Sequence, residues 1–154
     1  MTDGATISKN ILERLKISED RFNHIMLYIG QMIKDYKGSP IDVIKEIDLN
    51  LKGNERYIAL YATGSYFHNK FIKMSDVNQS EFVDSITDGL KISGERADKI
   101  QEYMMKITEE YFNKNISQAQ VFQEVVNSQF SNTEKDFIIF TFGLINFVEY
   151  FYVR

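Results

Sequence analysis

The side chains best suited to chemistry are the two histidines, His24 and His68, and the acids near them. Asp20 and His24 are four residues apart, a spacing that would place a carboxylate and an imidazole on one face of a helix. The chain has no His-x-x-x-His and no Glu-x-x-His spacing, so the zinc-hydrolase and di-iron bundle patterns are missing. Two ligands do not complete a site, and we therefore expect no bound metal and no cofactor.

Nucleophilic catalysis has equally little support. The chain has no cysteine, which excludes cysteine nucleophiles, thiolate metal sites and disulfides together. No serine lies in a Gly-x-Ser-x-Gly context, and no Gly-rich phosphate loop is present. We therefore name no catalytic residue. The sequence does not favour an enzyme, although it leaves that question open.

Two stretches, ILERLKISEDRFNHI and ITDGLKISGERADKI, have the order of a helix-turn-helix DNA-binding motif. In each, however, the second helix begins with acids, Glu19 and Asp20 in one and Glu95 and Asp98 in the other. The net charge is −4, whereas affinity for phosphate backbones comes from clustered Lys and Arg. We interpret both stretches as corners between helices in which the serine caps the second helix. DNA binding is the least favoured function, and nucleic acid is not an expected partner.

The segments that would position these side chains are predicted to be helices. Apolar residues recur at three- and four-residue steps, most clearly from Phe22 to Tyr36, and no segment alternates as a strand would. Ser39 followed by Pro40 is typical of a helix start. A length of 154 residues fits one domain, 1–154. The predicted fold class is all-α, a single domain of about eight helices.

The two halves of the chain repeat. LKIS occurs at 15–18 and again at 90–93, and the same ungapped frame, here called the LKIS frame, pairs Arg21 with Arg96 and Tyr28 with Tyr103. Two further helices follow in the same order. Chance explains scattered apolar matches between helical stretches better than it explains four consecutive identities. We therefore predict two tandem four-helix copies, repeat 1 (5–74) and repeat 2 (80–154), related by a pseudo-two-fold axis.

Each repeat is predicted to contain four helices. Their expected ranges are about 5–16, 18–37, 39–51 and 54–74 in the first repeat, and about 80–91, 93–113, 117–129 and 133–153 in the second.

The stretch 136–154, DFIIFTFGLINFVEYFYVR, is almost wholly apolar and raises the question of a membrane anchor. Its counterpart in repeat 1 carries Arg56, Lys70 and Lys73, which could not cross a bilayer. A helix that is apolar on all sides is otherwise a central core helix, which is our prediction. A membrane is not an expected partner.

A glycine lies near the middle of the last helix in both repeats, Gly64 and Gly143. Glycine inside a helix costs about 1 kcal/mol relative to alanine, so we expect a packing reason, a close approach of the two helices. The residues predicted to form this inter-copy interface, or a ligand cleft in the same place, are Tyr57, Tyr61, Gly64, Phe67, Phe140, Gly143 and Asn146.

Two functional hypotheses follow. The preferred one is a non-enzymatic acidic helical protein that binds or regulates another protein, or associates with itself. The alternative is a binder of a small apolar ligand in an aromatic-lined cleft between the two copies. The missing cysteines and the absence of an apolar segment in MTDGATISKN favour the cytoplasm.

Overall fold

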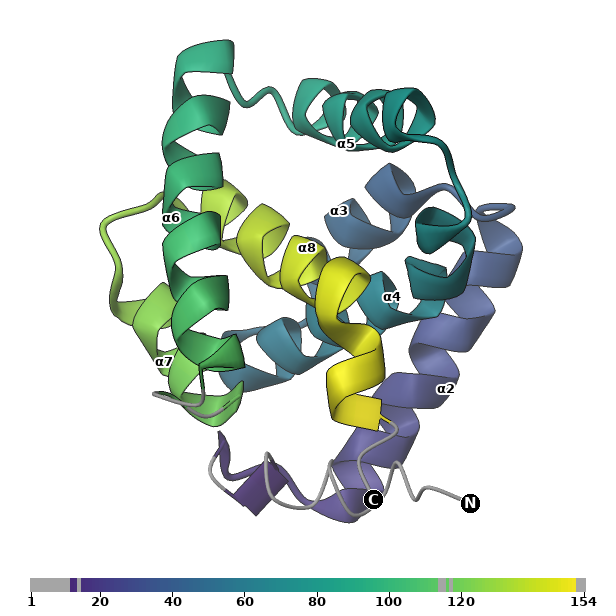
Figure 1. The fold of residues 1–154 in the computed structure, drawn as a ribbon. Coiled ribbons are helices and arrows are strands. Elements are labelled where there is room, and N and C mark those ends of the chain that lie inside the picture. The colour runs from purple at the N-terminus through teal and green to yellow at the C-terminus, as the bar shows by residue number, and fades with distance from the viewer. Residues whose placement is uncertain (1–11, 14, 114–115, 117, 152–154) are drawn as a thin grey trace.

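The computed structural model describes residues 12–13, 15–113, 116 and 118–151, and in that part of the chain it contains seven α-helices and no strand (Figure 1). The all-α fold class predicted from the sequence is confirmed. Of the predicted helix at about 5–16, the structure describes only residues 12–13 and 15–16, of which 12, 13 and 15 are helical. The seven helices are α2 (Glu19–Asp35), α3 (Pro40–Asn50), α4 (Gly53–Ile72), α5 (Asp76–Gly89), α6 (Gly94–Phe112), α7 (Gln118–Asn127) and α8 (Asn132–Phe151).

The two LKIS segments form the same turn. Lys16 and Lys91 both adopt left-handed backbone conformations, with φ of 59° and 61°. The next serines, Ser18 and Ser93, each accept a hydrogen bond from the backbone N–H three residues later, at 3.1 and 3.2 Å. A serine at this position satisfies one of the free N–H groups at a helix start. This local chemistry explains where α2 and α6 begin.

Helices α4 and α8 cross at the centre of the molecule (Figure 1). Helices α2 and α3 pack on α4, and α6 and α7 pack on α8. Helix α5 follows α4 in sequence but packs on α3, where a Cβ at Gly89 would lie 2.7 Å from the Cδ1 atom of Ile41. The small residue at the end of α5 therefore permits a close contact with α3, and Phe82 of α5 also packs on Phe67 and Phe71 of α4.

Helix α8 contains the apolar C-terminal stretch. Every residue from Asp136 to Leu144 is buried, so this part of the stretch lies in the core, as predicted. No helix within the described residues is long and apolar enough to cross a membrane.

Helices α4 and α8 approach each other most closely at two glycines, Gly64 and Gly143. A Cβ added to Gly64 would overlap the backbone carbonyl oxygen of Phe140, and a Cβ added to Gly143 would overlap that of Tyr61. The two helix backbones are therefore in direct contact, and alanine would not fit without a shift. The contact is also reciprocal, because Gly64 and Gly143, like Tyr61 and Phe140, are 79 residues apart in sequence.

Candidate functional site

Six of the residues that the sequence singled out lie on α4 and α8, the two helices that cross. Tyr57, Tyr61, Gly64 and Phe67 come from α4, Phe140 and Gly143 come from α8, and all six are buried. The side chain of Asn146 is outside the part of the chain that the structure describes. Their role in a ligand cleft or an inter-copy interface stays a prediction.

Aromatic packing surrounds this crossing. The Tyr61 ring lies 5.4 Å from the ring of Phe122 and 5.8 Å from that of Phe142, measured between centroids. The ring of Phe67 lies 6.4 Å from that of Phe140. Offset and edge-on arrangements at such distances are typical of aromatic cores. These side chains hold the two central helices together.

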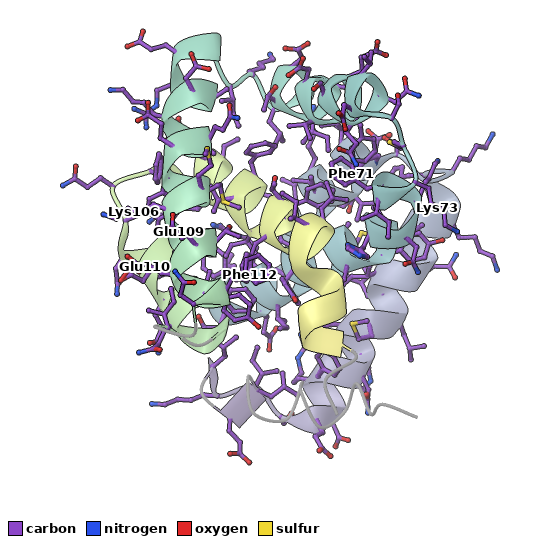
Figure 2. The ribbon with its side chains drawn as sticks, in the orientation of Figure 1. Phe71, Lys73, Lys106, Glu109, Glu110 and Phe112 are labelled. Atoms are coloured by element: carbon purple, nitrogen blue, oxygen red, sulfur yellow. The ribbon has the colours of Figure 1, made fainter. Side chains whose placement is uncertain are left out.

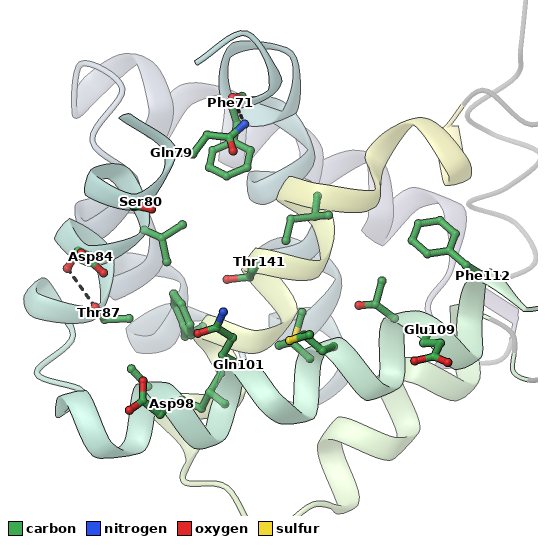
Figure 3. Close-up of a pocket in the computed structure, with 18 residues that line it drawn as sticks. Phe71, Gln79, Ser80, Asp84, Thr87, Asp98, Gln101, Glu109, Phe112 and Thr141 are labelled. Atoms are coloured by element: carbon green, nitrogen blue, oxygen red, sulfur yellow. Dashed lines mark hydrogen bonds between the residues drawn. The ribbon is translucent and has the colours of Figure 1, made fainter. Parts of the chain in front are cut away.

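A groove of about 750 Å³ lies elsewhere, between α5, α6 and α8, with Phe71 of α4 at one end (Figure 3). None of the six predicted residues whose side chains the structure describes lines it. Its floor is formed by buried apolar side chains, among them Ile100, Met104 and Phe137. Thr141 reaches into it from α8 (Figure 3).

The walls of this groove carry large apolar side chains that remain exposed. Met105 is 66%, Phe112 48% and Ile145 45% exposed, and all three line the groove. Figure 2 shows Phe112 on the side of α6 that faces α8, whereas Lys106 and Glu110 lie on its outer side. The apolar surface therefore belongs to the groove and is not scattered over the helix.

The groove is acidic at both ends. Asp84 and Asp98 lie at one end, and Glu109 lies beside Phe112 at the other (Figure 3). No Lys, Arg or His is among the described residues that line it. The side of α6 that forms one wall runs from Asp98 to Phe112, which corresponds to about 21 Å at 1.5 Å per residue.

A bidentate ion pair joins α6 to α8. Arg96 donates from Nε to Oε2 of Glu134 at 2.7 Å and from a terminal nitrogen to Oε1 at 2.8 Å. These hydrogen bonds lower the pKa of Glu134 to about 2. Arg21 makes the matching pair with Glu55 between α2 and α4, at 3.1 and 2.6 Å, and lowers the pKa of Glu55.

One buried acid lies close to the junction of α3, α4 and α8. Oδ1 of Asp136 is 3.0 Å from Nε of Arg56, whose Nη1 is 3.4 Å from Oδ1 of Asp48. Asp136 is 2% exposed, and burial raises its pKa to about 8 despite the nearby guanidinium. The Nε–Oδ1 approach is close in distance but not aligned as a hydrogen bond. The pair therefore stabilises the carboxylate less than its separation suggests.

The residues first considered for chemistry do not form a reactive centre in the described structure. His24 Nδ1 lies 2.8 Å from the backbone carbonyl oxygen of Asp20, and His68 Nδ1 lies 2.7 Å from that of Leu144. No group of three or more His, Cys, Asp or Glu side chains within the described residues could hold a metal ion. The groove, with its exposed apolar walls and acidic ends, is the best candidate site.

Sequence reasoning missed this groove, although α6 carried one signal. Gln101, Met105, Thr108 and Phe112 follow one another at steps of four, three and four residues, so they share a helix face. That face lies beside the buried stripe that contains Ile100, Met104 and Ile107. Two large apolar residues outside the core stripe of a helix could have suggested a contact surface.

Comparison with known proteins assigns no family. No protein-family model matches the sequence, and neither the curated proteins nor the solved structures give a significant match. The geometry and charge of the groove are therefore the basis for a functional proposal.

Proposed function

We propose that this chain is a protein-interaction domain whose groove between α5, α6 and α8 binds a helix of a partner protein. The observation that carries the proposal is the exposure of Met105, Phe112 and Ile145 around one hollow. Burying a side chain of this size is worth about 1.5–3 kcal/mol. Clustered exposed apolar side chains with a polar rim are typical of interaction sites.

The shape of the groove favours a helix as the occupant. The α6 wall is about 21 Å long, the length of a helix of about 14 residues. An amphipathic helix binds such grooves by its apolar face, with anchors at steps of three and four residues. Met104 lies in the floor and Met105 in the wall, and methionine adapts to side chains of different shape.

The charge of the groove favours a basic partner. Asp84, Asp98 and Glu109 lie at its ends without any positive side chain among the described lining residues. Lys or Arg residues flanking the apolar face of the bound helix would complement them. Electrostatic complementarity of this kind chiefly gives specificity and faster association. The chain as a whole is also acidic, with a net charge of −4.

The second candidate is a small apolar ligand in the same groove. A volume of about 750 Å³ falls within the usual range for ligand sites, and Thr141 and Gln101 could accept or donate a hydrogen bond. A small apolar ligand would not use the three acids at the ends of the groove. The helix is therefore the preferred occupant.

The test uses a fluorescein-labelled helical peptide of 16 residues with leucines at three- and four-residue steps and flanking lysines. Fluorescence anisotropy should show that Met105→Asp weakens binding at least about tenfold, or 1.4 kcal/mol, because the apolar contact is lost and the new carboxylate must be desolvated under the peptide. Leu49→Asp is the matched control, since Leu49 is 75% exposed on α3 and does not line the groove.

Three results decide between the candidates. Equal affinity of the wild type and the Met105→Asp variant would refute the groove as the binding site. A peptide with glutamates in place of the lysines should bind more weakly. Binding of the neutral dye N-phenyl-1-naphthylamine, lost in Met105→Asp, without any peptide binding would favour the small ligand.

We also infer that the domain arose by duplication of a four-helix unit, as two tandem repeats about a pseudo-two-fold axis. Three matched features support this: the LKIS turns, the ion pairs of Arg21 and Arg96, and the reciprocal contact of Gly64 and Gly143. If the contact is symmetric in energy as well as in geometry, Gly64→Ala and Gly143→Ala should lower the free energy of unfolding by equal amounts.

A further inference from the structure

A second hollow, of about 510 Å³, lies between α2 and α3 and is separate from the groove. Arg21 and Tyr28 line it from α2, Glu46 lines it from α3, and Leu51, which directly follows α3, closes one side. Its residues belong to the first half of the chain. The second half offers a direct comparison at the corresponding place.

In the second half of the chain, an aromatic ring lies at the position that corresponds to the hollow. The ring of Phe130 lies 5.1 Å from the ring of Tyr103 and 5.7 Å from the guanidinium carbon of Arg96. The LKIS frame pairs Tyr103 with Tyr28 and Arg96 with Arg21. The tyrosine and the arginine that contact the Phe130 ring therefore have counterparts, Tyr28 and Arg21, that line the hollow.

Leu51 occupies the position of Phe130. Each lies two residues before the first residue of the next helix, with Lys52 directly before α4 and Ser131 directly before α8. Leucine has no ring to lie between the tyrosine and the arginine. The first half therefore presents the same tyrosine and arginine around a hollow instead of around a side chain.

We propose that the hollow between α2 and α3 binds the aromatic ring of a small arylalkylamine, with Phe130 in the second half showing how the ring lies. The ring would stack on the Arg21 guanidinium and meet the Tyr28 ring edge-on, as Phe130 meets Arg96 and Tyr103. Arg21 is held in place by its two hydrogen bonds to Glu55.

Glu46 supplies the group that recognises the amine. Its Oε1 accepts a hydrogen bond from the Tyr36 hydroxyl at 2.8 Å, and its Oε2 accepts one from Nδ2 of Asn50 at 2.7 Å. These bonds fix the carboxylate, and each carboxylate oxygen can still accept another donor. An ammonium group is the donor that also complements its charge.

The test is an NMR titration with phenethylamine, which carries both the ring and the ammonium group. The signals of Tyr28 and His24, which both line the hollow, should shift and saturate. Benzyl alcohol, which has the ring and a neutral hydroxyl but no charge, and n-butylamine, which has the ammonium group without a ring, should each bind at least several-fold more weakly. Equal binding of n-butylamine, or no saturable binding of phenethylamine, would overturn the proposal.

Two variants make the test specific. Leu51→Phe should fill the hollow as Phe130 does, raise the melting temperature and weaken phenethylamine binding at least tenfold. Glu46→Gln keeps the shape of the side chain and should weaken phenethylamine binding several-fold while leaving benzyl alcohol unchanged. Unaltered phenethylamine binding in both variants would contradict the proposed site. Met105→Asp should have no effect, so this result is independent of the groove.

Discussion

Replacing Gly143 by alanine tests the central crossing of α4 and α8. In a free helix the change would stabilise by up to about 1 kcal/mol, because glycine is the poorer helix former. Here the new Cβ would overlap the carbonyl oxygen of Tyr61, which is backbone and cannot rotate away. The two helices must separate, and overpacking of this kind costs about 1–3 kcal/mol. The variant should therefore be less stable than the wild type, or at best no more stable.

Gly30 provides a matched control in the middle of α2. A Cβ at Gly30 would meet nothing within 4 Å, so Gly30→Ala should gain the helix preference without any overlap. Between the two variants we expect a difference in unfolding free energy of about 1–3 kcal/mol. In a domain of this size, each kcal/mol shifts the melting temperature by about 2–4 °C.

The assay is urea unfolding followed by circular dichroism, with thermal melts as a second measurement. Gly64→Ala should resemble Gly143→Ala, because its Cβ would overlap the equivalent carbonyl oxygen, that of Phe140. Gly143→Ala with a stability equal to that of Gly30→Ala would refute the close contact. A large difference between the Gly64 and Gly143 variants would contradict the reciprocal arrangement.

Two ionisable groups should give the stability a characteristic pH dependence. The pKa of Asp136 is raised from 3.8 to about 8, so its contribution to stability is present below 3.8 and is lost as the pH rises through 8. Asp136→Asn should thus gain stability relative to the wild type, by at least about 1 kcal/mol, between pH values of about 5 and 9 in urea melts; a constant difference would count against the raised pKa. The pKa of Glu134 is lowered from 4.5 to about 2, so its contribution is present above 4.5 and is lost as the pH falls through 2. The stability difference between the wild type and Glu134→Gln should shrink by about 1 kcal/mol over that acidic range, less than for a fully buried pair because Arg96 is partly exposed; an unchanged difference would contradict the role of Arg96.

Local features of the fold could be predicted from the sequence. The serine at each LKIS turn predicts where α2 and α6 begin. The recurrence of apolar residues every three or four positions predicts that both segments are helices. Charged residues are few in the C-terminal stretch, which indicates burial, and residues 136–144 lie in the core, whereas Ile145 is 45% exposed. These signals depend on neighbouring residues, which a single sequence shows directly.

The groove could not be predicted in the same way. Its opening depends on where α5 lies relative to α6, and α5 contacts residues far from it in sequence, such as Ile41 at Gly89 and Phe67 at Phe82. The burial of Asp136 could not be predicted either. Its counterpart in repeat 1 is Tyr57, so the comparison of the two repeats does not indicate a buried acid at this position. Long-range contacts of this kind decide which exposed apolar residues share a surface.

The most direct test of the proposed function is to map the lysine-flanked peptide on the protein by NMR chemical shifts. If the peptide binds in the groove, the largest changes should fall along α5, α6 and α8, at Val83, Met105, Phe112 and Ile145, with little change at Leu49 on α3. Changes concentrated on α2 and α3, or none at a saturating peptide concentration, would contradict binding in the groove.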